Sequence, residues 1–297
     1  MTGTAATRRE PRIRQLEPGD AAAAAGVIRA ANEAAAHARG QEPPSPPLAR
    51  RARWEGMLAR LAEVDRGGCY LAVRDDDTAV GVAASIRRGD LWGLSLLFVR
   101  PDQQSAGVGR ELLDAALSHA GGASVRMIQA SQDPRAVRRY AGAGLAIHPA
   151  MGAEGTVPAG LIPAGLPPAV PGGTADLDVV DAVDTDLRGS SRRSDVEHAL
   201  ATGSDLLVDP DGGGFAVQDD SRPLMLGARD EDTATRLLWQ CFARATKPVS
   251  LHGLTATQGW AMRVCLDAGL PLTAGGPMCL SGLARLPGPY YPSGIYF

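Results

Sequence analysis

Two glycines that lie two positions apart, Gly107 and Gly109, follow the apolar segment 91–99 and precede an amphipathic stretch. This pattern predicts a strand, a turn and a helix whose first backbone amides have no partners inside the helix. These amides carry a partial positive charge, and glycines let an anion approach the backbone because they have no Cβ. The segment therefore predicts a binding site for a phosphate group.

The segment lacks the features of two common phosphate sites. No Gly-Lys-Ser/Thr follows the glycines, so the lysine and hydroxyl of a nucleoside triphosphate loop are absent. A dinucleotide fold would place its glycine-rich turn after an early strand and an acidic residue about twenty positions later. Here the turn follows several other predicted elements, which argues against a dinucleotide fold.

What remains resembles the Gln/Arg-x-x-Gly-x-Gly/Ala loop of GCN5-related N-acetyltransferases (GNAT), with Gln104, Gly107 and Gly109 in the motif positions. In that family the loop amides hold the pyrophosphate of coenzyme A, and the preceding strand hydrogen-bonds the pantetheine arm. The resemblance implies an acetyl-CoA site made by Leu97, Phe98, Val99, Gln104, Ser105, Ala106, Gly107, Val108, Gly109, Arg110, Asp133 and Tyr140.

A second segment, DPRAVRRYAGAGL at 133–145, carries the same resemblance. Asp133, Ala136, Tyr140, Gly144 and Leu145 have the spacing of the family's Asn-x-x-Ala-x-x-x-Tyr-x-x-x-Gly-Phe helix, with Asp and Leu in place of the usual Asn and Phe. The resemblance implies that the Tyr140 hydroxyl acts as general acid toward the coenzyme A sulfur. The alternative is a tyrosine whose ring only packs the helix onto the sheet.

Acetyl transfer to an amine also needs the amine to be neutral. Strand 91–99 contains no Asp or Glu, so a base must come from elsewhere. Asp133, Glu33 and Glu55 are candidates for this base by location. Glu33 and Glu55 are also candidate substrate-binding residues. For each of the three, the alternative is a carboxylate that is solvated or caps a helix. In multidomain Eis-like acetyltransferases the terminal carboxylate is the base. Phe297 is therefore a further candidate if the aromatic tail 288–297 reaches the acceptor pocket of the first domain. The alternative is a tail packed only on its own domain.

The elements before the loop are a strand at 13–16, helices at 20–38 and 48–64, and strands at 69–74, 79–86 and 91–99. GQEPPSPP at 40–47 separates the two helices because its prolines cannot continue either one. In the family this connection lies over the acceptor pocket, whereas on residues alone an ordinary solvated loop is equally consistent. After the loop come a strand at 124–131 and a helix that contains Tyr140.

The pattern then recurs after VPAGLIPAGLPPAVPGG, a Pro/Gly-rich linker. The strand starting at Ser124 lies twenty positions before Gly144, and the strand starting at Val249 lies twenty before Gly269. This pseudo-repeat predicts an α/β fold with a mixed sheet, in two tandem GNAT-like domains. We expect a disordered N-terminus at 1–11, a catalytic half at 12–157, a linker at 158–173 and a degenerate half at 174–297.

The second copy differs from the first at the phosphate loop. From Leu97 to Leu113 there are 16 positions, but from Met225 to Leu238 there are 13. Its turn contains DED at 230–232, which would stabilise a helix start but repel a phosphate. Cys265 stands four positions before the Gly-Leu pair, where the first copy has its tyrosine. One coenzyme site per chain is therefore expected.

Composition excludes several other classes of function. The formal net charge of −3 and a pI near 6.0 give no broad basic surface for nucleic acid. The four cysteines and five histidines show no metal-site spacing, so no metal and a reduced, cytoplasmic protein are expected. No segment resembles a signal peptide or a membrane span. Arg188, Arg192 and Arg193 are expected on a solvated face paired with Asp184, Asp186 and Asp195, the alternative being contact with an acidic ligand group.

These observations favour an acyltransferase that transfers acetyl from acetyl-CoA to a primary amine, in a monomer or weak homodimer. The acceptor is expected to be a small molecule. The alternatives are a protein N-terminus or lysine as acceptor, or a non-catalytic protein that binds and senses acyl-CoA. Retention of Tyr140 in the copy that keeps the loop favours catalysis.

Overall fold

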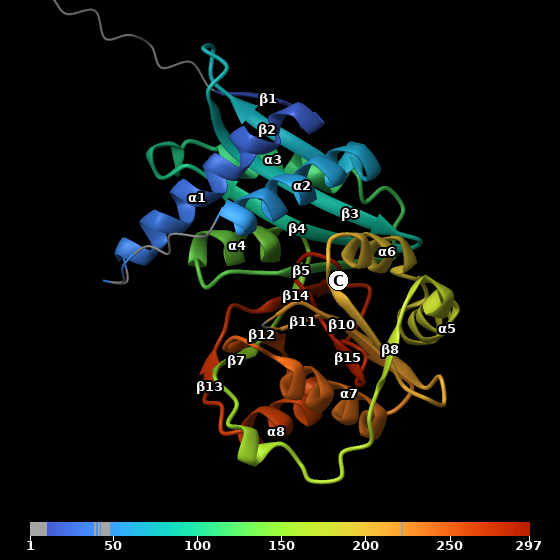
Figure 1. Cartoon of the computed structure of the whole chain (residues 1–297). Coiled ribbons are helices and arrows are strands. Elements are labelled where there is room, and N and C mark those ends of the chain that lie inside the picture. The colour runs from blue at the N-terminus through green and yellow to red at the C-terminus, as the bar shows by residue number, and fades with distance from the viewer. Residues whose placement is uncertain (1–10, 39, 41, 43–47, 221) are drawn as a thin grey trace, which may run out of the picture. The chain divides into compact units, whose positions relative to one another are not determined.

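The computed structural model describes residues 11–38, 40, 42, 48–220 and 222–297, which form two compact units (Figure 1). Unit 1 contains the described residues up to Arg87 and Leu94–Gly121, and unit 2 contains Arg88–Gly93 and Gly122–Phe297. Apart from residue 11, the expected disordered N-terminus lies outside the described residues, as does most of the proline-rich connection at 40–47. The ends of the two predicted halves, 12–157 and 174–297, are not the ends of these units and stay a prediction.

Unit 1 is built on antiparallel strands that follow the predicted ones closely. The order is β1 (Arg12–Gln15), β2 (Cys69–Val73), β3 (Ala79–Arg88) and β4 (Leu91–Val99), the last of which begins in unit 2. Helices α1 (Ala21–Ala38) and α2 (Leu48–Val64) pack against each other, and α3 (Val108–Ser118) packs on β2. Gly81 lies under α3, where a Cβ would be 2.7 Å from the Leu112 side chain, so glycine allows the close approach.

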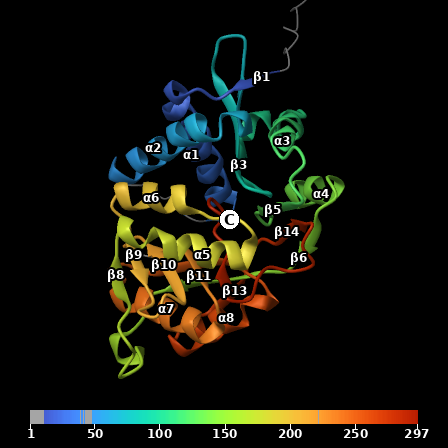
Figure 2. The same ribbon diagram turned by 90° about the vertical axis from the view of Figure 1, so that its right-hand side faces the viewer.

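Unit 2 contains a five-stranded sheet with helices on both faces (Figures 1 and 2). Its order is β15 (Tyr290–Tyr291), β11 (Pro223–Ala228), β10 (Gly214–Gln218), β9 (Asp205–Val208) and β8 (Val170–Gly172). Its helices are α5 (Leu177–Arg188), α6 (Arg193–Ala201) and α7 (Glu231–Arg244). Side chains alternate along the strands, so Phe215 packs with the α5 residue Val183, and Ala216 packs with the α7 residue Leu237.

Strand β8 lies inside the segment that the sequence predicts to be a linker. Residues 170–172 pair with β9 at the edge of the five-stranded sheet. Pro171 has no backbone N–H and is tolerated there because an edge strand need not donate on both sides. The linker prediction is therefore wrong for these last residues, since a short proline-containing strand has no periodicity to reveal it.

The remaining strands of unit 2 show an exchange between the two sequence halves. Strand β14 (Met278–Ser281) from the second half pairs with β5 (Val125–Gln129) and β6 (Ala146–His148) of the first. Strand β7 (Met151–Gly155) from the first half pairs with β12 (Val249–Leu254) and β13 (Leu272–Ala274) of the second. Figure 1 shows the red β14 beside the green β5. Each half thus supplies the central strand of a three-strand group whose outer strands belong to the other half.

Two helices end in the same way and support the predicted repeat. Helix α4 (Pro134–Gly142) is followed by Gly144 at φ +85°, and the Leu145 amide donates back to the Tyr140 carbonyl at 3.2 Å. Helix α8 (Gly259–Asp267) is followed by Gly269 at φ +74°, and the Leu270 amide donates to the Cys265 carbonyl at 2.9 Å. A left-handed glycine followed by an apolar residue is a common helix stop. Both Gly-Leu pairs therefore have the same structural role.

Candidate functional site

The loop between β4 and α3 has the geometry that its glycines predict. Gly107 is the N-cap residue of α3 with φ +87°, and Ser105 also has a positive φ of +70°. Within the described chain no side chain caps this helix start, and residues 104–107 are exposed. The Gln104 amide donates to the Val99 carbonyl at 3.2 Å, which ties the loop to the end of β4. The exposed turn at 104–107 therefore precedes a helix start whose backbone amides are suited to an anion.

A carboxylate in this loop is neutralised by its neighbours. Asp102 accepts from the Arg74 guanidinium at 2.8 Å and from Arg100 at 3.3 Å, and Gln103 donates to the same side chain at 3.1 Å. Burial alone would raise the pKa of Asp102, but the hydrogen bonds from Gln103 and Arg100 outweigh it and lower that pKa. The paired Asp102 thus offers little repulsion to a phosphate at the start of α3.

The corresponding helix start in the second half is already occupied by a side chain. Only two residues separate the end of β11 from α7. The Asp230 carboxylate accepts from the Thr233 amide at 2.7 Å, and this hydrogen bond lowers the pKa of Asp230. The N-terminus of α7 therefore has an acidic cap where α3 has an open glycine turn, as the sequence predicts.

The C-terminal tail closes the same region of the second half from the other side. In β15, Tyr290 and Tyr291 pair with Gly227 and Leu226 of β11, the strand that corresponds to β4 in the repeat. The Tyr291 hydroxyl also accepts from the backbone amide of His252 in β12, at 3.2 Å. The tail thus bridges β11 and β12 and occupies the edge of β11 opposite β10.

Tyr140 lies on α4 with 5% of its surface exposed. Burial is the main cause that raises its pKa, and the neighbouring thiol of Cys279, on the exchanged strand β14, adds to the rise. Burial also raises the pKa of Cys279 to about 11. Tyr140 is therefore a protonated phenol at neutral pH and can donate a hydrogen bond, whereas Cys265 fills the equivalent position of α8.

Two other candidates have clear structural surroundings. Asp133 is the N-cap of α4 and accepts from the Arg135 amide at 2.8 Å. It also pairs with the Arg135 guanidinium at 2.7 Å, and this pairing lowers the pKa of Asp133. A carboxylate held in this way is a weak base. Phe297 is fully buried and its ring lies against Gly93, where a Cβ would be 2.2 Å from the ring. The tail is packed, as its aromatic residues predict, and a role of Phe297 as base stays a prediction.

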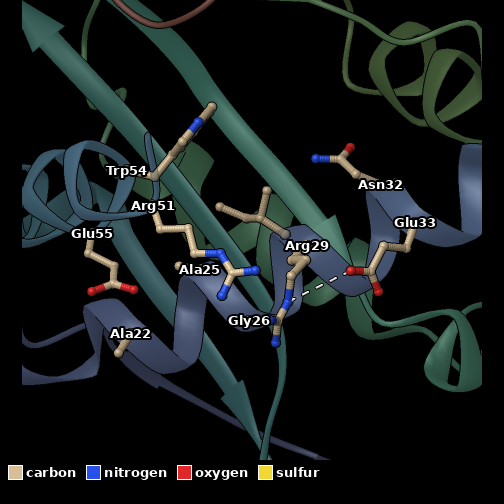
Figure 3. Close-up of a pocket in the computed structure, with 10 residues that line it drawn as sticks. Ala22, Ala25, Gly26, Arg29, Asn32, Glu33, Arg51, Trp54 and Glu55 are labelled. Atoms are coloured by element: carbon tan, nitrogen blue, oxygen red, sulfur yellow. Dashed lines mark ion pairs between the residues drawn. The ribbon is translucent and has the colours of Figure 1, made fainter. Parts of the chain in front are cut away.

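A cavity of about 240 Å³ lies between α1 and α2 in unit 1 (Figure 3). Glu33 and Glu55, chosen from the sequence by location alone, both line it. Sequence reasoning missed the two arginines there, although Arg29 precedes Glu33 by one helical turn and lies 3.9 Å from it. The lining residues are Ala22, Ala25, Gly26, Ile28, Arg29, Asn32, Glu33, Arg51, Trp54 and Glu55.

The arginines near α5 and α6 are not placed as the sequence suggests. Arg188 and Arg192 are buried, so a solvated face is wrong for both. Arg192 instead pairs with the buried Asp184, at 2.7 and 2.9 Å. Arg193 is on the surface and pairs with Asp178 at 2.8 Å. Asp184 supplies a buried counter-charge for Arg192 from one end of the connection between α5 and α6, and Arg188, one helical turn after Asp184, lies 3.8 Å from the same carboxylate.

No helix in the described part of the chain is long and apolar enough to cross a membrane. Nor do three or more His, Cys, Asp or Glu side chains from this part of the chain gather as metal ligands. The four cysteines are buried free thiols.

Comparison with known proteins gives a family and a fold. Residues 51–150 match the model of the acetyltransferase (GNAT) domain. No curated protein matches the sequence. The chain is similar to a protein from Pyrococcus horikoshii assigned as an acetyltransferase, with a TM-score of 0.79 and 16% identity over 100% of this chain and 99% of that chain. The chain is also similar to a GCN5-related N-acetyltransferase from Sphaerobacter thermophilus. The TM-score is 0.57 and the sequence identity 18%, over 94% of this chain and 96% of that chain.

A tandem GNAT protein from the clavulanic acid biosynthesis pathway gives a TM-score of 0.57 and 16% identity over 93% of this chain and 100% of that chain. These likenesses cover the whole α/β chain, including the second half, which the family model does not match. The matched domain contains both the open turn at Gly107 and the buried Tyr140. Residues 51–150 therefore belong to the acetyltransferase (GNAT) domain family, and the chain as a whole has the fold of a tandem GNAT protein.

Proposed function

We propose that this protein is an acyltransferase that moves the acetyl group of acetyl-CoA to the primary amine of a small molecule, with one coenzyme site per chain. The observation that carries the proposal is the start of α3. It presents an exposed glycine turn with no side-chain cap among the described residues, in the half of the chain that matches the family model. The equivalent start of α7 is capped by Asp230.

The loop fits the phosphates of coenzyme A. At Gly107 a Cβ would have no neighbour nearer than 3.7 Å, so the backbone is open to a ligand on that side. Backbone amides of residues 105–109 would hold the pyrophosphate, because those of Gln104 and Arg110 already donate to the carbonyls of Pro101 and Gly107. The half-buried segment Leu97–Val99 would bind the pantetheine arm. When bound, acetyl-CoA supplies the acetyl group as a thioester.

Tyr140 has the properties of the acid in this reaction. Its hydroxyl keeps its proton at neutral pH because burial raises its pKa, and it can give that proton or a strong hydrogen bond to the departing sulfur. Asp133 is proposed as a coenzyme contact rather than as the base, because its carboxylate already pairs with Arg135.

The cavity between α1 and α2 is proposed as the acceptor site. Glu33 and Glu55 would attract a cationic amine, and either carboxylate could accept its proton. Arg29 and Arg51 in the same cavity would bind a negative group on the acceptor, and Trp54 offers an apolar wall. This lining favours a small zwitterionic amine, and a volume of about 240 Å³ suits a small molecule.

Calorimetric titration of acetyl-CoA into wild type, Gly107→Glu and Gly203→Glu tests the coenzyme site. The two glycines are a matched pair, since both are exposed and both have φ +87°, but Gly203 follows α6 in the second half. We expect one molecule bound per chain in wild type and Gly203→Glu, and no binding in Gly107→Glu. No binding to wild type would overturn the proposal, and two molecules per chain would contradict the closed second half.

Transfer is measured in the same samples with a panel of small amines and with peptides. We expect turnover with small zwitterionic amines. Glu33→Gln and Glu55→Gln should each raise KM about tenfold, the value of one charge-assisted hydrogen bond. Glu63→Gln, an exposed α2 residue that does not line the cavity, is the control and should leave KM unchanged. Tight coenzyme binding with no transfer to any amine would indicate a sensor, and transfer only to peptides would indicate a protein acetyltransferase.

A further inference from the structure

Unit 2 buries a group of charged side chains where α5 ends and α6 begins. The Arg192 guanidinium pairs with both oxygens of Asp184, at 2.7 and 2.9 Å. The Arg88 guanidinium pairs with both oxygens of Asp195, at 2.7 Å each. None of these four side chains is more than 9% exposed. Each pair is therefore internally balanced in charge.

Arg188 is a third buried guanidinium and has no carboxylate of its own. Its Nη1 donates to the Ser190 carbonyl at 3.1 Å and lies 3.8 Å from Asp184, which already accepts from Arg192. Its Nε and Nη2 are buried and have no hydrogen-bond partner in the structure. Its side chain is 2% exposed.

Arg188 shares its carboxylate partners with other arginines. The carboxylates that act on Arg188 are those of Asp184 and Asp195, and both are already paired. Arg188 therefore lies in the interior with no carboxylate at hydrogen-bond distance among the described residues. Burial lowers the pKa of Arg188, but an arginine stays charged at any ordinary pH. An unpaired buried charge is costly, so an anion from outside the chain would be strongly favoured there.

A cavity of about 110 Å³ lies directly beside this arginine. Arg188 and Tyr290 are its polar lining residues, and the Tyr290 hydroxyl is also buried without a hydrogen-bond partner. The other walls are apolar and include Leu91, Val125 and Met127. The cavity therefore combines two hydrogen-bond donors, one of them charged, with walls that are otherwise hydrocarbon.

We propose that this cavity binds a small monocarboxylate with a short alkyl chain, such as acetate or propionate. The carboxylate would accept from Nε and Nη2 of Arg188, the planar fork that matches two carboxylate oxygens, and from the Tyr290 hydroxyl. The alkyl part would contact the apolar walls. A single negative charge matches the single charge of Arg188, whereas a phosphate dianion would exceed it. This site is separate from the proposed acetyl-CoA and acceptor sites and does not rest on them.

The test uses full-length protein dialysed into a buffer free of carboxylates. Acetate, propionate and butyrate are titrated by calorimetry, and thermal unfolding is followed with each. Sodium chloride and phosphate at equal ionic strength are the inorganic arms. We expect saturable binding of one carboxylate per chain and a rise in Tm that exceeds the effect of either inorganic salt. Failure of every carboxylate to bind folded wild type would overturn the proposal, as would equal binding of chloride.

Arg188→Met removes the charge and keeps most of the side-chain volume. It should weaken carboxylate binding at least tenfold, whereas the control Arg193→Met, on the surface, should bind like wild type. Without carboxylate, Arg188→Met should be at least as stable as wild type, because it removes an uncompensated buried charge. A Tm well below wild type in that buffer would show that Arg188 is already balanced and would refute the proposal.

Tyr290→Phe provides a second variant that keeps the ring and the fold. Loss of its hydroxyl should weaken carboxylate binding about tenfold, the value of one hydrogen bond to a charged group. Unchanged affinity in both Tyr290→Phe and Arg188→Met would place any bound carboxylate elsewhere and overturn the assignment.

Discussion

Because the halves exchange central strands, we predict that neither half folds alone. Fragment 12–157 lacks β14, which pairs with both β5 and β6. In the full chain the β14 side chains of Met278 and Leu280 are 0% and 1% exposed. Burying them contributes about 3–6 kcal/mol together. The free energy of unfolding of a whole domain is only about 5–15 kcal/mol, so the loss of β14 removes a large part of that stability.

The assay compares fragments 12–157 and 174–297 alone, the two co-expressed, and the full chain. We expect no cooperative thermal unfolding and no acetyl-CoA binding from either fragment alone. Together they should form a stable complex that copurifies and binds the coenzyme. Circular dichroism during heating and calorimetric titration give the two readouts.

A full-length protein with a protease site at Gly165 provides the control. This glycine lies in a turn where a Cβ would meet nothing within 4 Å, so an insertion is tolerated there. Cleavage after folding should leave the pieces associated, with Tm close to that of the intact chain. The reasoning is refuted if fragment 12–157 alone unfolds cooperatively near the full-length Tm and binds acetyl-CoA.

Three further predictions concern single residues. Tyr140→Phe should lower kcat about 100-fold with acetyl-CoA affinity and Tm unchanged; an unchanged kcat in folded protein would remove the acid role. Asp230→Ala should cost about 1 kcal/mol of unfolding free energy at neutral pH, measured with urea. The Thr233 amide lowers the pKa of Asp230 in the folded state. The stability lost in Asp230→Ala should therefore be complete above the unfolded-state pKa of about 3.9 and should vanish as pH falls through the folded-state pKa. A loss of stability that does not depend on pH would contradict the capping role. Asp195→Asn should cost about 3–5 kcal/mol in the same assay because Arg88 would stay buried without its carboxylate, and a loss below about 1 kcal/mol would show that Arg88 finds another partner.

The phosphate loop and the helix ends were predictable because their chemistry is local. Gly107 and Gly144 adopt positive φ, which only glycine does at low cost, so their positions are legible in the sequence. The same holds for Asp230, whose capping role follows from its place before a helical pattern. The family resemblance and the fold follow from these local features.

The strand exchange was not predictable in this way. Strands β7 and β14 are only five and four residues long, and nothing within them specifies which neighbours they pair with. The burial of the Arg188 side chain was missed because arginine is mostly exposed, and only the fold reveals that it shares Asp184 with Arg192. Arg29 and Arg51 in the α1–α2 cavity were missed because they look like ordinary helix-surface charges.

The exchange also sets an order of events during synthesis. Strands β5 and β6 are complete by His148, but the strand that fills the gap between them ends at Ser281. At about 5–20 residues per second, the ribosome needs roughly 7 to 27 s to make the segment between His148 and Ser281. During that time β5 and β6 have unpaired edges, which can pair with other chains. The helix that bears Tyr140 thus waits for its supporting strand until almost the whole chain has been made.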